Sequence, residues 1–143
     1  MNQTLWPLFL ACLWTACAGC SKSEYSGPER FPLAGKVTFE GEPVDAGTIS
    51  FLPADASGEQ RVSGGTIVDG TYSVPEAQGA NAGKHRIEIR WMKRTGKQVR
   101  DPISSEMIDQ RVEGLPAKYH TDSALTTDVP SPTGTYDFDL KKK

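Results

Sequence analysis

The chain has 143 residues, and its 16 Lys and Arg against 18 Asp and Glu give a formal net charge of -2. This length allows one domain of ordinary size, and the near-neutral balance argues against a nucleic-acid binder, which needs a basic face. With 14 Gly, 10 Pro and 37% hydrophobic residues, the composition favours short strands and excludes a polytopic membrane protein, a coiled coil and a large multi-domain enzyme.

The first segment has the pattern of an export signal. Residues 1–19 carry no charged side chain, contain an apolar run from Leu5 to Trp14, and end in small residues before Cys20. Such a stretch is typical of a secretory signal and is shorter than the roughly 20 apolar residues that span a membrane comfortably. We therefore expect a signal peptide over 1–19, with a freely secreted protein or an uncleaved anchor as alternatives.

Ala18-Gly19-Cys20 resembles the end of a bacterial lipobox, in which the cysteine carries the lipid through a thioether. The resemblance implies a lipidated Cys20 and an exported protein anchored to the cell envelope, either periplasmic or surface-exposed. Cys17, which stands where such boxes usually have Leu, is an alternative site. Residues 20–32 would then form the lipidated end and a flexible polar linker.

Residues 33–140 have the pattern of a small all-β domain. Apolar and polar residues alternate through each predicted strand, and Gly41-Glu42-Pro43 marks a turn. Asp69-Gly70 is a hairpin signal, because such a turn needs positive φ. The predicted strands, seven in all, cover residues 34–40, 48–52, 64–68, 71–74, 84–92, 125–129 and 135–140.

Residues 93–120 are predicted to form a long and irregular segment. Ser104–Val112 fits either a helical turn capped by Ser104 or Ser105 or a mobile loop, and the sequence does not choose between them. After the last strand, residues 141–143 are a basic tail that we expect to be solvated.

Short strands separated by frequent turns predict a single antiparallel β-sandwich. Its core is expected to contain the residues on one face of each strand. These are Val37, Phe39, Ile49, Phe51, Ile67, Tyr72, Val74, Ile87, Ile89, Trp91, Leu125, Val129, Tyr136, Phe138 and Leu140.

Several segments have a familiar order: Gly35-Lys36-Val37-Thr38-Phe39, Gly47-Thr48-Ile49-Ser50-Phe51, Asp69-Gly70-Thr71-Tyr72, Pro116-Ala117-Lys118-Tyr119 and Tyr136-Asp137-Phe138-Asp139-Leu140. Over roughly residues 33–140 the chain resembles the carboxypeptidase-regulatory-like, transthyretin-like β-sandwich. More narrowly, it resembles the small predicted lipoproteins of planctomycete bacteria. The resemblance implies a fold and an address rather than a mechanism, since its motifs are turns and core residues.

A candidate binding surface follows from charge and aromatic residues. Arg90, Lys93 and Arg94 belong to a basic stretch over 86–100 that could meet anionic lipid or an acidic polymer. Tyr72 and Trp91 could stack on a sugar, although at strand spacing they also suit a core. The remaining candidate, Tyr119, either pins the long loop onto the sandwich or belongs to a recognition surface.

The sequence offers little chemistry. His85 and His120 belong to no metal-binding pattern, and His120-Thr121-Asp122-Ser123 holds triad residue types only as neighbours, which is not the geometry that a triad needs. Transthyretin-like hydrolases end in Tyr-Arg-Gly-Ser, whereas this chain ends in Leu140 and three lysines. We expect no catalytic residue, no metal and no cofactor.

The sequence thus predicts a membrane-tethered, non-enzymatic envelope lipoprotein. Its β-sandwich would serve as a structural module or bind an envelope protein or polysaccharide, and no nucleic acid. A carbohydrate-binding module is the alternative, and a transthyretin-like hydrolase is a less favoured one.

Overall fold

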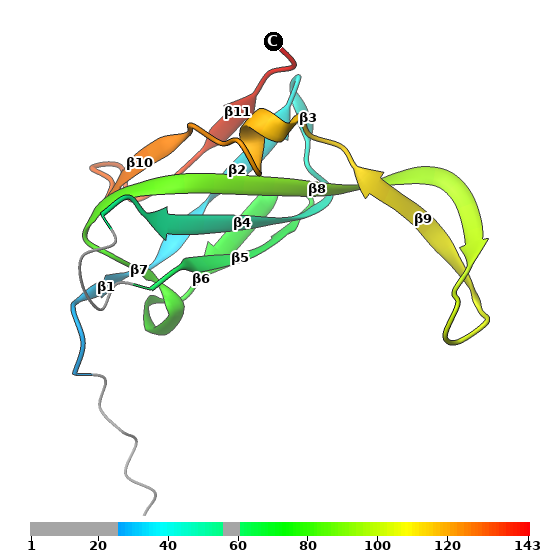
Figure 1. Cartoon of the computed structure of the whole chain (residues 1–143). Helices are drawn as coiled ribbons and strands as arrows, with labels where there is room; N and C mark the ends of the chain where they lie inside the picture. Colours follow the sequence, from blue (N-terminus) through cyan, green and yellow to red (C-terminus); the bar gives the residue numbers. More distant parts are fainter. Residues whose placement is uncertain (1–25, 56–60) are drawn as a thin grey trace, which may run out of the picture.

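The computed structural model describes residues 26–55 and 61–143 (Figure 1). The expected signal peptide, Cys17, Cys20 and the first part of the expected linker lie outside the described residues. Within the described part of the chain, no helix is both long and apolar enough to cross a membrane.

The described chain is all-β, with two short 3-10 helices and no α-helix. Each predicted strand forms, and four further strands (β1, β3, β7 and β9) make the predicted number too low. The elements are β1 (Arg30–Phe31), β2 (Leu33–Phe39), β3 (Glu42–Pro43), β4 (Ala46–Pro53), β5 (Ser63–Val68), β6 (Thr71–Val74), η1 (Glu76–Gln78), β7 (Ala80–Asn81), β8 (Gly83–Arg100), β9 (Met107–Glu113), η2 (Ala117–Tyr119), β10 (Thr126–Val129) and β11 (Phe138–Leu140).

Most of the strands form one sheet in the order β10-β8-β4-β5-β6-β2-β11, with β3 on β2 and β9 on β8. The pairings are antiparallel except that β11 runs parallel to β2, which departs from the predicted all-antiparallel arrangement. β11 follows β10 along the chain but lies at the opposite end of the strand order, because the chain crosses over between them.

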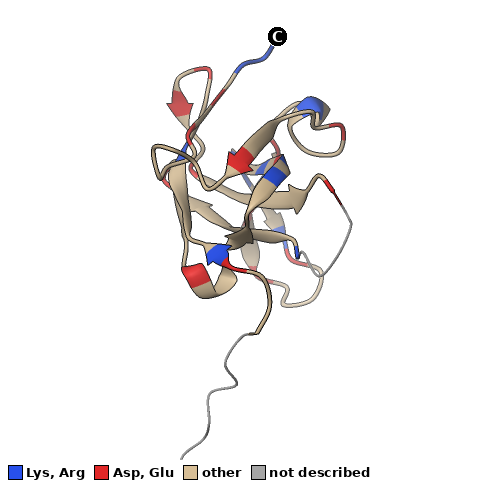
Figure 2. Ribbon diagram, turned by 90° about the vertical axis from the view of Figure 1, so that its left-hand side faces the viewer, with Lys and Arg blue, Asp and Glu red and all other residues tan. Residues whose placement is uncertain are grey.

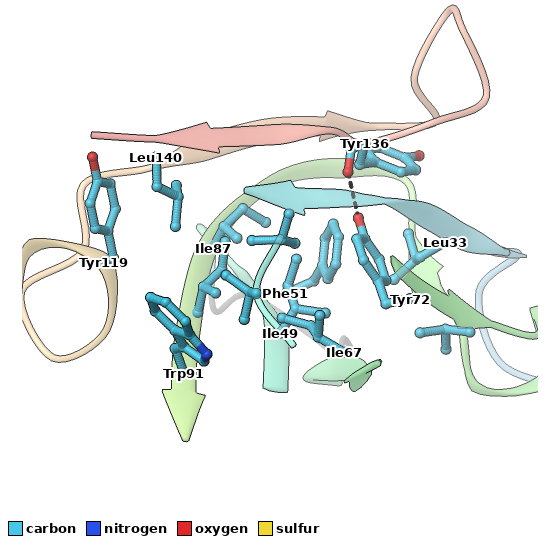
Figure 3. Packing of buried hydrophobic residues seen from close by; sticks show 14 of the residues in the cluster. Leu33, Ile49, Phe51, Ile67, Tyr72, Ile87, Trp91, Tyr119, Tyr136 and Leu140 are labelled. Carbon is cyan, nitrogen blue, oxygen red and sulfur yellow. Dashed lines mark hydrogen bonds between the residues drawn. The ribbon is translucent and has the colours of Figure 1, made fainter. Parts of the chain in front are cut away.

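The sheet curls, so that residues of strands far apart in the strand order meet in one hydrophobic core (Figure 3). Phe39 of β2 meets Trp91 of β8 edge-on, with ring centroids 6.0 Å apart. Phe51 of β4 packs in the same way against Tyr136, at 5.6 Å. The first contact joins two strands that are far apart in the sheet, and the second joins β4 to the segment before β11, so both close the core.

The predicted inward residues are confirmed. All are buried except Phe39, Leu125 and Phe138, which are partly buried and pack against the core. The sequence missed a set of core residues from strand ends and loops, where no alternation marks them: Leu33, Val44, Ala80, Leu115 and Tyr119.

The predicted Asp69-Gly70 turn is confirmed by its backbone geometry, whereas the turn predicted at Gly41-Glu42-Pro43 is made by Glu40 and Gly41, because Glu42 and Pro43 form β3. Asp69 and Gly70 have φ of 48° and 75° and close the β5–β6 hairpin. Glu40 and Gly41 have φ of 53° and 84° and connect β2 to β3. Positive φ at both central positions matches the twist of the flanking strands, which explains why glycine stands second in each turn.

Both ends of the domain are more ordered than expected. Arg30 and Phe31, which we assigned to the linker, form β1 against β7. Asn81 Nδ2 donates to the carbonyls of Pro28 and Glu29, 3.0 Å from each. In the expected basic tail, the backbone of Lys141 is held by Tyr119. The folded unit therefore extends beyond residues 33–140.

The largest correction concerns residues 93–120. Both interpretations of Ser104–Val112 were wrong, since β8 runs on to Arg100 and pairs with β9. We name residues 92–113 the arm, because this hairpin projects beyond the other strands (Figure 1). Most of its side chains are exposed. The two strands therefore have no alternation of buried and exposed residues from which they could be predicted.

Candidate functional site

Two of the expected binding residues belong to the core. The exposed fraction is 4% for Tyr72 and 5% for Trp91, so neither ring offers a face on which a sugar could stack. The Tyr72 hydroxyl donates to the carbonyl of Tyr136 at 2.8 Å, as Figure 3 shows. Burial raises the pKa of Tyr72. The carbohydrate alternative thereby loses the two rings on which it depended.

Tyr119 holds the chain after the arm against the end of β11. Its ring is buried, and its hydroxyl donates to the carbonyl of Lys141 at 2.7 Å and accepts from the Lys141 amide at 2.9 Å. Helix η2 thereby ties the chain after the arm to the strand end at Leu140. Of the two roles considered for Tyr119, the structure supports the one in which it holds the long loop against the rest of the domain.

Trp91 marks the point at which the body of the sheet becomes the arm. β8 pairs with β4 as far as Trp91 and with β9 from Met92 onward. The indole Nε1 donates to Asp45 Oδ1 at 2.6 Å, and this hydrogen bond lowers the pKa of Asp45. Gly114 lies so close to the indole that an added Cβ would stand 2.8 Å from Trp91 Cε3. The base of the arm is therefore fixed to the body.

The three basic candidates gather at this base, but each has a partner there. Arg90 lies 3.6 Å from Glu113 and Arg94 lies 3.9 Å from Asp109. The Lys93 ammonium stands over the Trp91 ring, 4.8 Å from its centroid. On the side of the molecule away from the arm, which faces the viewer in Figure 2, acidic and basic residues are likewise interspersed. The basic stretch is therefore partly neutralised by β9 rather than presented as an open cationic patch.

The histidines do not converge with a nucleophile. His85 is fully buried, and its Nδ1 lies 3.1 Å from the carbonyl oxygen of Gly83. His120 Nε2 lies 3.3 Å from the carbonyl of Leu115. The Ser123 hydroxyl donates to the carbonyl of Ile87 instead of a histidine. The residues of the His120–Ser123 run therefore do not form a triad.

The described residues form a pocket but no cluster of side chains that could hold a metal ion. Within 26–55 and 61–143, no group of three or more His, Cys, Asp or Glu side chains is placed to hold a metal ion. A pocket of about 250 Å³ is bordered by β5, η1 and Arg30. Among the described residues that line it there is no carboxylate and no imidazole, the usual general bases.

The arm carries most of the exposed apolar surface. Among the described residues, large hydrophobic side chains are exposed at eight positions, and only Val62 and Val68 lie outside the arm. The six on the arm are Met92, Val99, Ile103, Met107, Ile108 and Val112. Such a concentration on one element is typical of an interaction surface.

Register assigns these side chains to faces, because residues directly opposite in an antiparallel pair point the same way. Val99 pairs with Ile108, and Val112 pairs with Lys93. Ile108 and Val112 are four residues apart on β9 and therefore share a face. The arm thus has one face with an apolar strip of Val99, Ile108 and Val112, all exposed by 37–45%.

The opposite face is mainly charged. Arg94 faces Arg111, Gln98 faces Asp109 and Arg100 faces Met107. Three residues of β8 are bulged between Arg94 and Gln98, while β9 continues without interruption. The sequence missed this two-faced arrangement, although the alternation of Ile108, Gln110 and Val112 with Asp109 and Arg111 carries a signal for it.

Comparison with known proteins adds little. No family model matches the sequence, and no curated protein matches it. A crystal structure of a 9R-lipoxygenase from Cyanothece PCC8801 is similar over 86% of this chain, with 11% identity and a TM-score of 0.35. The chain spans 18% of that protein, and a likeness of this strength carries no argument about fold or activity.

Proposed function

We propose that the protein is an exported, lipid-anchored and non-enzymatic envelope protein whose arm binds a second envelope protein. The observation that carries this proposal is the concentration of exposed apolar side chains on an element that projects from the body. Removing that strip from water would supply a favourable free energy for association. The same side chains contribute little to the core, since they lie beyond the point where β4 ends its pairing with β8.

A protein partner suits the arm better than a polyanion. Arg94 of the arm and Arg90 at its base each lie beside an acidic side chain of β9, which reduces the positive potential that would attract an acidic polymer. The apolar strip would instead meet apolar side chains of a partner, with charged residues around it. Such an arrangement resembles the apolar core and polar rim of protein interfaces.

We further propose that the curled sheet forms the two layers of a β-sandwich of the transthyretin-like, carboxypeptidase-regulatory-like type. The contacts of Phe39 with Trp91 and of Phe51 with Tyr136 across the core support this proposal. An experimentally determined structure would test it. Superposition of both layers on a transthyretin-like domain is expected, and a closed barrel without two layers would contradict the proposal.

Photo-crosslinking in cells that make the protein naturally tests the binding proposal. Benzoylphenylalanine replaces Val99 on the apolar strip or, as the matched control, Val68, an exposed valine on β5 of the body. We expect the arm position to give an adduct with a different protein and the body position to give none. Equal adducts from both positions, or adducts from Val99 between two copies only, would overturn the proposed partner.

Intact-mass spectrometry tests the anchor. Protein purified from its native membrane is expected to begin at Cys20 and to carry acyl chains, which a Cys20→Ala variant loses. A mature chain that is cleaved but not acylated would make the protein a freely secreted one. Acylation that persists in the Cys20→Ala variant and disappears in a Cys17→Ala variant would move the anchor to Cys17.

A further inference from the structure

The outer edge of β9 is open. β9 pairs with β8 on one side, and among the described residues no strand pairs with its other side. An open edge presents unpaired amide and carbonyl groups to any strand that approaches. In many proteins such an edge is closed by adding another strand through backbone hydrogen bonds.

The hydrogen bonds inside the arm show which groups face outward. The Gly114 amide donates to the carbonyl of Trp91, and the carbonyl of Glu106 accepts from the Asp101 amide. Successive residues of a strand direct their backbone groups to opposite edges. Because residues 106 and 114 both face β8, the residues that face the open edge are Met107, Asp109, Arg111 and Glu113.

The sequence of this edge is complementary to itself. When two copies of β9 run antiparallel with Gln110 opposite Gln110, Asp109 of each copy faces Arg111 of the other. In the same register Ile108 faces Val112, so opposite charges meet on one face and apolar side chains meet on the other. Each of these cross-strand pairs is of a stabilising kind.

Backbone geometry permits this register. Asp109 and Arg111 both direct their amides and carbonyls to the open edge, so each pair can exchange two hydrogen bonds. Gln110 and Gln110 form a pair without hydrogen bonds on the two-fold axis, where Cα atoms come closest. Such a two-fold contact is self-complementary and closes after two copies.

The neighbouring arrangements are disfavoured. A register centred on Asp109 opposes two carboxylates on the axis, and one centred on Arg111 opposes two guanidinium groups. Parallel pairing in register would place every charged residue beside its own copy. Like charges directly opposite destabilise a pair of strands, so the order of Asp109 and Arg111 selects the antiparallel register centred on Gln110.

We propose that two copies of this chain associate through β9, so that their arms form one sheet in the order β8-β9-β9-β8. The pairing joins the apolar strips of both arms into one wider surface of Val99, Ile108 and Val112 from each copy. This inference goes beyond the proposed function, since it uses the edge of the arm and needs neither a lipid nor a second protein.

Cysteine crosslinking of the full chain tests the register. A Gln110→Cys variant places two thiols on the axis, where the Cα separation of about 4.5 Å suits a disulfide. Met107→Cys is the matched control, because the two copies of residue 107 are then separated by about six residues of strand, or roughly 20 Å. We expect rapid disulfide dimer formation in the first variant and only the background of the unsubstituted chain in the second.

Charge reversal tests the same contact without added thiols. Sedimentation of the full chain in mild detergent is expected to show a dimer that an Asp109→Arg variant weakens about tenfold or more, since two attractive pairs become repulsive. The double variant Asp109→Arg with Arg111→Asp restores opposite charges across the axis and should recover the dimer.

Several results would overturn the proposal. These are a chain that stays monomeric up to about 1 mM, a dimer that the Asp109→Arg variant leaves intact, or equal crosslinking through positions 107 and 110. If the charge variants fail to fold, the cysteine pair still decides. A failed dimer would leave the Val99 adduct with another protein unaffected, so the two proposals can fail separately.

Discussion

At the scale of single residues, the hydrogen bond between the Trp91 indole and the Asp45 carboxylate links the base of the arm to the body. The hydrogen bond from the indole holds the pKa of Asp45 below its usual value. A lowered carboxyl pKa adds stability above the unfolded pKa of about 3.9, and this contribution is lost as the pH falls through the folded value. Asp45→Ala should therefore lower the free energy of unfolding by about 1 kcal/mol at pH 7, a value reduced for the exposure of the carboxylate.

Urea denaturation at pH 7 and near pH 3 measures this effect. The difference between Asp45→Ala and the natural chain should shrink at the lower pH, because Asp45 is then increasingly protonated. Asp128→Ala, which removes an exposed carboxylate from β10, serves as the control and should change stability little. A cost at Asp45 that is the same at both pH values would show that the carboxylate charge is not involved.

The hydroxyl of Tyr72 is expected to matter for stability rather than for binding. Tyr72→Phe removes the buried hydrogen bond to the carbonyl of Tyr136 and should cost about 1–2 kcal/mol of unfolding free energy. Since burial raises the pKa of Tyr72, the stability contributed by its protonated hydroxyl is fully present below the unfolded pKa of about 10 and is lost as the pH rises toward and through the higher folded pKa.

Thermal unfolding across neutral and alkaline pH checks this prediction. Tyr136→Phe is a useful comparison, because the Tyr136 hydroxyl accepts from the amide of Ser131 in a surface loop and should cost less. A Tyr72→Phe variant as stable as the natural chain would mean that the carbonyl of Tyr136 is satisfied without the phenol.

At the scale of elements, the predictability of each strand follows its burial. β4, β6 and the first half of β8 alternate between buried and more exposed residues, so their period is visible in the sequence. β9 and the second half of β8 are exposed on both faces, so burial imposes no such period and only the weak alternation around Ile108 and Val112 remains. The sequence alone does not reveal that these two segments pair with each other. Only that pairing identifies residues such as Ile108 and Val112 as one face of a hairpin.

The candidate site was harder to predict than the fold for the same reason. Tyr72 and Trp91 were candidates because aromatic rings can bind sugars, but strand alternation had already placed both in the core. Arg94 was assigned to a basic stretch, whereas its neighbour Asp109 came from a segment interpreted as a helical turn or a mobile loop. The charge balance of the arm depends on strand pairing and could not be read from the stretch alone.

The arm should be removable without unfolding the body. β8 keeps its pairing with β4 and β10 over residues 83–91, and Lys93 opposes Val112 at a position where the strands exchange hydrogen bonds. Replacing residues 94–111 with Asn-Gly should therefore close a two-residue hairpin. We expect urea unfolding to remain cooperative with a midpoint close to that of the natural chain, and loss of cooperative unfolding would show that the body depends on the arm.

At the scale of the whole molecule, the proposed anchor and the proposed arm pairing act on each other. Residues 21–29 between Cys20 and β1 span at most about 30 Å when extended, so lipidated copies would share a thin layer above the membrane. Confinement to such a layer raises the effective concentration of each copy for another. A pairing that is weak in solution would then be populated at the membrane surface.

This coupling predicts a difference between two forms of the same variant. In cells, disulfide formation through Gln110→Cys should be greater when Cys20 is present than in the Cys20→Ala background at equal copy number. The Met107→Cys chain in both backgrounds corrects for thiol reactivity and for contacts made by crowding alone. Equal crosslinking with and without Cys20, in a chain whose acylation is lost, would mean that the β9 pairing is strong enough to need no membrane and that the two features act independently.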